Sequence, residues 1–377
     1  MPSKFADFPT KLLLVVLWLP CTQVTAQSPV ANHPVASRPV ASRPPLLQVR
    51  TQAAEQLLGL PIHWSDFDAV LLESTGRMHH LSQSDITSHK LLERTFQPQS
   101  TLDASRVLQQ ELGPNFEVLI QGPYVIGSPK SRAARWRDRF QSLLAGYIRY
   151  FEVRGWPLRQ PDFPLVVIVL PDRSSFQRYL AREGVRLGPN VVGSYLPKSN
   201  RCVMYELDGA VGVDWSETEA TIVHEAVHQI AFNTGVHERL AENPLWLVEG
   251  FATMFEQPAV YDTRVNHSTL ESRMLIPKVQ QLQPILREPG ALESRLRSMI
   301  ESDGIFQQEQ LTSYAVGWAL TFYLSERMPN EFAAYLKLQR KRDFGSYSSA
   351  SRARDFRKTF QMEPASLAQQ IQRLLQN

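Results

Sequence analysis

The sequence predicts an α+β protein in which a small mixed sheet comes first and a mostly helical half follows. Between residues 116 and 207, short apolar runs of strand length alternate with turn residues. After residue 216, apolar residues recur at helical spacing almost to the end of the chain. Strands and helices that are segregated along the chain in this way are typical of α+β folds.

Individual elements in the first half can be read from their patterns. Residues 165–170 form a continuous apolar run, which predicts a central strand buried on both faces. Aromatic and aliphatic residues recur every three or four positions from Trp136 to Phe151, which predicts a helix that ends near Gly155. Residues 191–196 and 201–207 are expected to form a strand pair.

The N-terminal 26 residues have the pattern of a secretory signal peptide. Lys4 and Lys11 are basic, residues 12–19 are apolar, and Val24-Thr25-Ala26 is a small-residue cleavage site. An apolar run of this length is too short to span a bilayer, which takes roughly 20 residues. We therefore expect an exported protein, periplasmic or extracellular, without a stable membrane span after cleavage. Retention of the segment as an anchor is the alternative.

The rest of the chain divides into three parts. Residues 27–47 are rich in Pro, Ala, Ser and Arg, which predicts an extended linker. Residues 48–112 are expected to form a small N-terminal α/β region with a hairpin of residues 69–73 and 78–81. Residues 113–377 then form the main domain.

Charge and cysteine content exclude several kinds of protein. The formal net charge is +3, which is too small to predict a nucleic-acid partner. Only Cys202 would remain after signal cleavage, so neither a disulfide framework nor a zinc–thiolate cluster is expected. Cys202 lies in an apolar run and is interpreted as a packing residue.

The main candidate site is the segment His224-Glu225-Ala226-Val227-His228. Histidines four residues apart lie on one face of a helix, close enough for both to bind one metal ion. Glu225 can reach a water at that ion without binding the ion itself. The alternative is a pair of helix histidines satisfied by hydrogen bonds alone.

The helix that carries this motif has signals at both ends. Ser216 and Glu219 form a capping box at its start, and Gly235 stops it.

A second helix is expected to begin at Pro244 and to end by Pro258, and it contains Glu249 among apolar residues. A carboxylate in such surroundings needs a partner. A metal ion would supply one, and a structural salt bridge is the alternative.

These two segments resemble the gluzincin metallopeptidases of the thermolysin and M1-aminopeptidase type. His-Glu-x-x-His is followed, 21 residues after His228, by the Glu of Trp-Leu-x-Glu-Gly-Phe-Ala. The nearest resemblance is to an uncharacterised family of exported bacterial gluzincin-like proteins, from about residue 48 to the C-terminus. The resemblance implies a zincin-like fold, Zn²⁺ held by His224, His228 and Glu249, and Glu225 as catalytic base.

The same resemblance implies a role for Tyr314. Tyr314-Ala-Val-Gly has the Tyr-x-x-Gly form of M1-type enzymes, in which the Tyr polarises the substrate carbonyl. The alternative is that Tyr314, as an aromatic residue on a helix, only packs in the core. Two features depart from the pattern. Thr253 replaces the thermolysin-type carboxylate four residues after the Glu ligand, and the Gly-Ala-Met-Glu-Asn motif of aminopeptidases is not found.

The predicted function is therefore that of a zinc peptidase acting on a peptide or protein substrate, with residues 201–207 as an edge strand that aligns the substrate. A catalytically silent zincin-fold binding protein of the cell envelope is one alternative. A zinc hydrolase of a non-peptide bond is another. The oligomeric state, and whether residues 48–112 are a prodomain, stay open.

Overall fold

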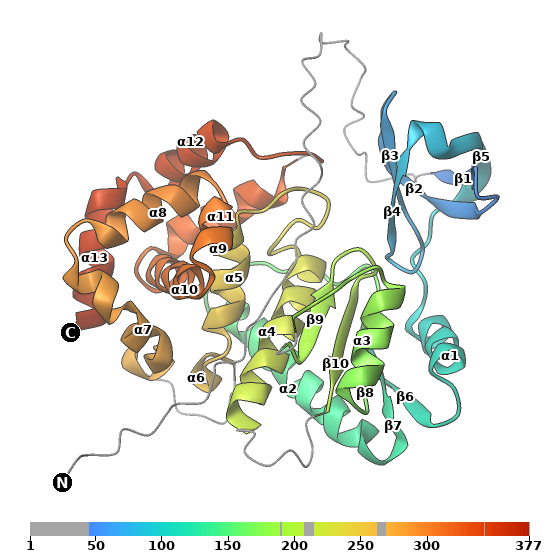
Figure 1. Cartoon of the computed structure of the whole chain (residues 1–377), viewed down its shortest axis with the longest axis horizontal. Coiled ribbons are helices and arrows are strands. Elements are labelled where there is room, and N and C mark those ends of the chain that lie inside the picture. Colours follow the sequence, from blue (N-terminus) through green and yellow to red (C-terminus); the bar gives the residue numbers. More distant parts are fainter. Residues whose placement is uncertain (1–44, 189–190, 207–214, 262–268, 343, 377) are drawn as a thin grey trace.

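The computed structural model describes residues 45–188, 191–206, 215–261, 269–342 and 344–376, with the backbone alone for residue 131 and for 215–219. It confirms the α+β fold class: two five-stranded sheets are followed by a helical half (Figure 1). The predicted signal peptide and nearly all of the predicted linker lie outside the described residues. No helix within the described ranges is long and apolar enough to cross a membrane.

The first sheet is antiparallel throughout, in the order β4-β3-β2-β1-β5. Its strands are β1 (Pro45–Thr51), β2 (Gln56–Trp64), β3 (Asp68–Leu72), β4 (Met78–Ser82) and β5 (Ile86–Thr95). The predicted hairpin is confirmed as β3 and β4, with Leu72 opposite Met78. The structure adds three strands to it, and the first begins at Pro45, inside the segment expected to be linker.

The second sheet is mixed, in the order β6-β7-β8-β10-β9. Its strands are β6 (Phe116–Gln121), β7 (Tyr124–Pro129), β8 (Leu165–Leu170), β9 (Gly193–Leu196) and β10 (Arg201–Tyr205). Strand β8 is central, as predicted, and pairs in parallel with β7 and β10. Because helices cover both faces of this sheet, every residue of β8 is buried.

Four helices enclose the second sheet. Helices α1 (Thr101–Leu112) and α3 (Arg173–Arg182) pack on one face. Helices α2 (Ala133–Glu152) and α4 (Trp215–Thr234) pack on the other, where Cys202 is fully buried as predicted. Helix α1 thus packs on the second sheet, although it belongs to the segment 48–112 that was expected to form a separate small region.

The expectation that residues 201–207 form an edge strand is wrong. Strand β10 lies between β8 and β9, and the edge next to α4 is β9. Both strands are short and apolar, so their patterns carry no information about which one ends the sheet.

The helical half covers the remaining face of α4. It comprises α5 (Leu245–Met254), α6 (Pro258–Tyr261), α7 (Ile276–Arg287), α8 (Ala291–Glu301), α9 (Gly304–Gln308), α10 (Gln310–Arg327), α11 (Pro329–Arg340), α12 (Ser349–Phe360) and α13 (Pro364–Gln376). Figure 1 shows α4 and α5 in the middle of the molecule, between the second sheet and these helices. Any site built from α4 and α5 is therefore enclosed on both sides.

The first sheet is attached to the second through two turns. In the turn before β4, Gly76 accepts a hydrogen bond through its carbonyl from Arg239, which also donates to the carbonyl of Pro197 in the β9–β10 turn. The Met78 N–H donates to the Lys198 carbonyl at 2.8 Å. The first sheet thus rests on the turn that leads out of the edge strand β9.

Candidate metal centre

The His-Glu-x-x-His segment lies in the middle of α4. The helix ends at Thr234, and Gly235 follows with φ of +77°, a conformation that glycine adopts without strain. Its first residue is Trp215, one residue before the predicted cap Ser216, and the side chains of that cap lie outside the described part. His224 and His228 project from one face of this helix, as their spacing predicted.

Glu249 lies in α5, directly after the first turn. Helix α5 packs closely on α10 because Gly250 has no side chain: a Cβ there would stand 2.2 Å from the Gly317 carbonyl oxygen. The hydroxyl of Thr321 also donates to the Trp246 carbonyl at 3.2 Å. This contact explains the glycine at position 250, and it fixes α5 against α10, whereas a Cβ at Gly317 would make only ordinary contacts, the nearest at 3.5 Å from the Trp246 carbonyl oxygen.

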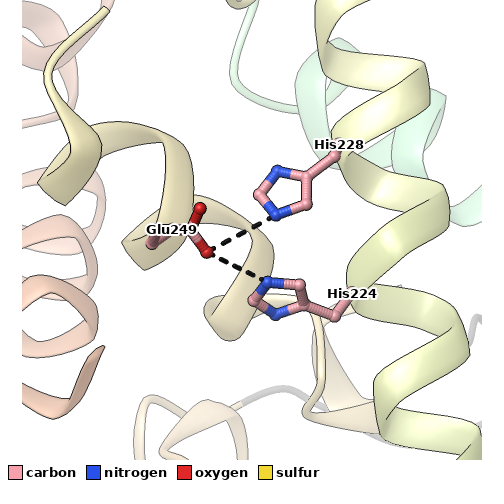
Figure 2. Close-up of side chains that lie close together, drawn as sticks. All are labelled: His224, His228 and Glu249. Carbon is pink, nitrogen blue, oxygen red and sulfur yellow. Dashed lines mark hydrogen bonds and ion pairs between the residues drawn. The ribbon is translucent and has the colours of Figure 1, made fainter. Parts of the chain in front are cut away.

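The two helices bring the predicted ligands together (Figure 2). The carboxylate oxygen Oε2 of Glu249 lies 3.2 Å from Nε2 of His224 and 3.5 Å from Nε2 of His228. The three side chains are at most 2% exposed. In the part of the chain that the structure describes, they are the one group of three metal-binding side chains, with ligand atoms within 4.8 Å of one another.

The donor set fits a divalent transition metal. Two imidazole nitrogens and one carboxylate oxygen match the three-ligand set of catalytic zinc sites. Neither ring nitrogen of His228 makes a hydrogen bond, and Nε2 has only its 3.5 Å ion-pair contact with Glu249, so this buried atom is poorly satisfied unless it binds something more. His224, His228 and Glu249 therefore lie close enough, and have the right chemistry, to bind a metal ion.

Without a metal ion, the site holds a proton in its place. Burial alone would lower the pKa of His224, but hydrogen bonds to Glu249 and Glu256 outweigh it and raise that pKa to about 10. Burial would raise the pKa of Glu249, but the two histidines hold it well below its usual range. The metal-free site thus contains an ionised carboxylate and a protonated His224.

The predicted base is attached to the edge strand. Glu225 is 1% exposed, and its Oε2 accepts a hydrogen bond from the Tyr195 N–H of β9 at 2.6 Å. Burial raises the pKa of Glu225, against the opposing effect of His228 and His224. The geometry places a proton acceptor, held by backbone, between the ligand helix and the sheet edge.

Glu256 is part of the site, although the sequence analysis did not identify it. Its Oε1 lies 2.8 Å from Nδ1 of His224, the ring nitrogen opposite the one that faces Glu249. A carboxylate in this position fixes the orientation and tautomer of a ligand histidine. It lies two residues beyond the end of α5, so helical spacing from Glu249 gave no firm signal for it.

Tyr314 lies beside the ligands. It is in α10, it is 8% exposed, and its ring centroid is 6.2 Å from that of His224. It also packs edge-on against Phe306 at 5.9 Å. The close packing of α10 on α5 brings Tyr314 to the metal centre, and its packing contacts are also those of a core residue.

We expect zinc binding to release a proton from His224. Because a ligand histidine must be neutral and His224 is protonated up to about pH 10, zinc affinity should rise about tenfold per pH unit between about pH 7 and 9. Calorimetric titrations in buffers of different ionisation enthalpy measure this release. Binding with no proton released near pH 8 would contradict it.

The same pKa shift predicts how the metal-free protein responds to pH. The pKa of His224 is higher in the folded protein than in the unfolded chain, so its stabilising contribution is complete below about pH 6.5 and is lost as the pH rises through about 10. Thermal unfolding of the metal-free protein across this range measures that loss.

Replacement of Glu256 by Gln should weaken zinc binding about 10- to 100-fold, because the amide orients the ring of His224 without a negative charge. Competition with a zinc chelator measures the dissociation constant. Glu293→Gln is the control, since Glu293 pairs with Arg297 on the exposed side of α8. Equal zinc affinity in wild type and Glu256→Gln would exclude this role.

A comparison with known proteins finds similarity over the segment that contains the site. Residues 218–344, about a third of the chain, match a family described as a protein of unknown function, DUF1570. This segment contains His224, Glu225, His228, Glu249 and Tyr314, but it is much shorter than the resemblance expected from the sequence. No curated protein matches the chain. Similarity to a family of unknown function is shown, and the gluzincin resemblance stays a prediction.

Proposed function

We propose that the protein is a zinc-dependent peptidase of the gluzincin type. The observation that carries this proposal is the position of Glu225: a buried carboxylate beside a two-histidine, one-glutamate centre, held by the backbone of an edge strand. A purely structural metal site has no use for such a group. Proton transfer in hydrolysis requires one.

The chemistry follows from the residues around the centre. Zinc bound by His224, His228 and Glu249 would supply Lewis-acid activation of a carbonyl and of water. Glu225 accepts a proton from the attacking water and delivers it to the departing amine, and burial raises its pKa, which makes it a stronger base than an exposed carboxylate. Tyr314 donates a hydrogen bond to the carbonyl oxygen as negative charge develops there.

Strand β9 is the surface on which an extended substrate would lie. Neighbouring residues of an antiparallel edge strand alternate between bonding inward and facing outward. The Tyr195 N–H is directed to Glu225 rather than to β10, so the backbone groups of Gly193 and Tyr195 point away from the sheet, and all four residues of β9 are buried. A peptide added to this edge would pass directly by the catalytic base.

Export belongs to the same proposal. The basic, apolar and small-residue order of residues 1–26 is that of a signal peptide, and its removal would release the protein into the periplasm or the extracellular space. The natural substrate would then be a peptide or protein of that compartment.

Two other functions share parts of this arrangement. A zincin-fold binding protein of the cell envelope would keep the fold without cleaving anything. A zinc hydrolase of another bond would use the same three ligands and the same base, because the chemistry of the centre is not specific for peptides.

The Glu225→Gln variant should lose peptide cleavage while it keeps zinc. The amide cannot accept the proton, so kcat should fall by about 10²- to 10⁴-fold. The measurement is mass spectrometry of a mixed peptide library incubated with wild type and variant, together with the zinc content of each. Cleavage by both proteins at equal rates would assign the activity to a contaminant or to another group.

The Tyr314→Phe variant refines this experiment, because it keeps the ring and its packing. A loss of about 10²- to 10³-fold in kcat with unchanged zinc affinity is expected from an oxyanion donor. Wild-type rates would leave Tyr314 as a core residue. Zinc binding without cleavage by any of the proteins would exclude a peptidase and favour the binding protein.

Export predicts a mature N-terminus at Gln27. Expression of the full chain in a bacterial host, followed by fractionation and intact-mass measurement, determines both the compartment and the cleavage site. Leu14→Arg interrupts the apolar run and should keep the protein in the cytoplasm. An exported chain that retains residues 1–26 would indicate an anchor, and an unprocessed wild-type chain in the cytoplasm would contradict export.

A further inference from the structure

A buried arginine lies at the start of the helix that carries Glu249. Arg352 of α12 is 2% exposed, and it contacts carboxylates from two other segments. Its Nη1 and Nη2 each donate to one oxygen of Asp303 at 2.7 Å, and Nη2 also donates to Glu242 at 2.5 Å. Glu242 belongs to the loop that enters α5, so Arg352 joins that loop to the residue before α9.

Asp303 in turn caps α5. Its Oδ1 accepts a hydrogen bond at 2.9 Å from the N–H of Leu245, the first residue of the helix. Pro244 precedes Leu245 and offers no side-chain cap of its own. A carboxylate at this end satisfies one of the free N–H groups and interacts favourably with the helix dipole. The start of α5 is thus held by a side chain from outside the helix.

The distance from this cap to the metal centre is short. Glu249 follows Leu245 by four residues, about 6 Å along the helix axis. A rotation or shift of the first turn of α5 therefore moves the Glu249 carboxylate directly. Ligand geometry at a metal tolerates little such movement.

Stability alone is a weak reason for this arrangement. Burying an arginine with carboxylates costs desolvation free energy that the ion pair often fails to recover. Such pairs are better suited to fixing the positions of the groups that they join. We infer that Arg352 is a positioning residue for the metal ligand Glu249, acting through the Asp303 cap of α5. Arg352 lies outside residues 218–344, so the matched segment does not by itself contain the complete support of its centre.

This inference rests on the metal-binding part of the proposed function and is independent of peptide cleavage. Its test uses the whole protein and measures the zinc dissociation constant, together with the visible absorption spectrum of the Co²⁺-loaded form, which reports ligand geometry. Arg352→Met keeps the apolar stem, and Asp303→Asn removes the negative charge that pairs with Arg352 and caps α5. Arg77→Met is the control, because Arg77 forms an ion pair of 2.7 Å with Glu183 of the α3 segment.

Arg352→Met should raise the zinc dissociation constant about 10- to 100-fold and change the Co²⁺ spectrum, whereas Arg77→Met should do neither even where it lowers the melting temperature. Arg352→Met and Asp303→Asn together should weaken binding by less than the product of their separate effects, because both act on one cap.

Three results would overturn the inference. The first is wild-type zinc affinity and an unchanged Co²⁺ spectrum in Arg352→Met. The second is independent, multiplicative effects in the double variant. The third is no divalent-metal binding by the wild type, which would remove the centre itself. If Arg352→Met does not fold, Asp303→Asn decides alone: weaker zinc binding supports the inference and wild-type affinity refutes it.

Discussion

The burial of the Glu249 carboxylate between two histidines is the constraint on which the rest of the structure depends. An ionised carboxylate that is 2% exposed is unstable unless it is paired, and His224 and His228 are its partners. The partners come from another helix, so α4 and α5 must be held together closely. The absence of a side chain at Gly250 lets α5 pack against α10. Helix α5 therefore lies between α10 and α4 and contacts both. The helical half can therefore be understood as the support that keeps one carboxylate in position.

The charged groups around His224 allow a metal ion to replace the proton on its ring. Glu249 and Glu256 contact opposite nitrogens of His224, and in the metal-free state the proton on that ring is their common counter-charge. A bound divalent ion would take over the same role with one more positive charge, and its charge would also act on Glu225. Burial disfavours ionisation of Glu225 most strongly when no cation is near, so the metal ion also favours the form that accepts a proton. Binding of the ion and ionisation of Glu225 are thus linked through their charges.

The parts of the structure that could be predicted from sequence are those set by local spacing. A spacing of four residues places His224 and His228 on one face of a helix, and an all-apolar run places β8 in the middle of a sheet. Both features depend on the local sequence alone. Strand order is a property of the whole sheet, so the short apolar runs at 193–196 and 201–205 could not reveal which one is the edge. Strand β5 of the first sheet was missed for a different reason: it is largely exposed and polar, with no alternating apolar pattern. Glu256 lies just beyond the last residue of α5, where helical periodicity is least reliable as a guide.

The base depends on the sheet rather than on the helices. Tyr195 can donate to Glu225 only if β9 keeps its place, and the turn after β9 is tied to α4 by paired amides: Asn200 and Asn233 each donate to the other, at 2.9 and 2.8 Å. Asn200 adopts φ of +59°, a conformation that this network stabilises. The first sheet rests on the same turn through Arg239, so removing that sheet would expose the turn that supports Glu225, the proposed base. A prodomain that leaves on activation would more naturally cover a site than hold its base in position. The contacts therefore favour the first sheet as a permanent part of the fold, in which helices hold the candidate metal ligands and the edge of a sheet holds the proposed base.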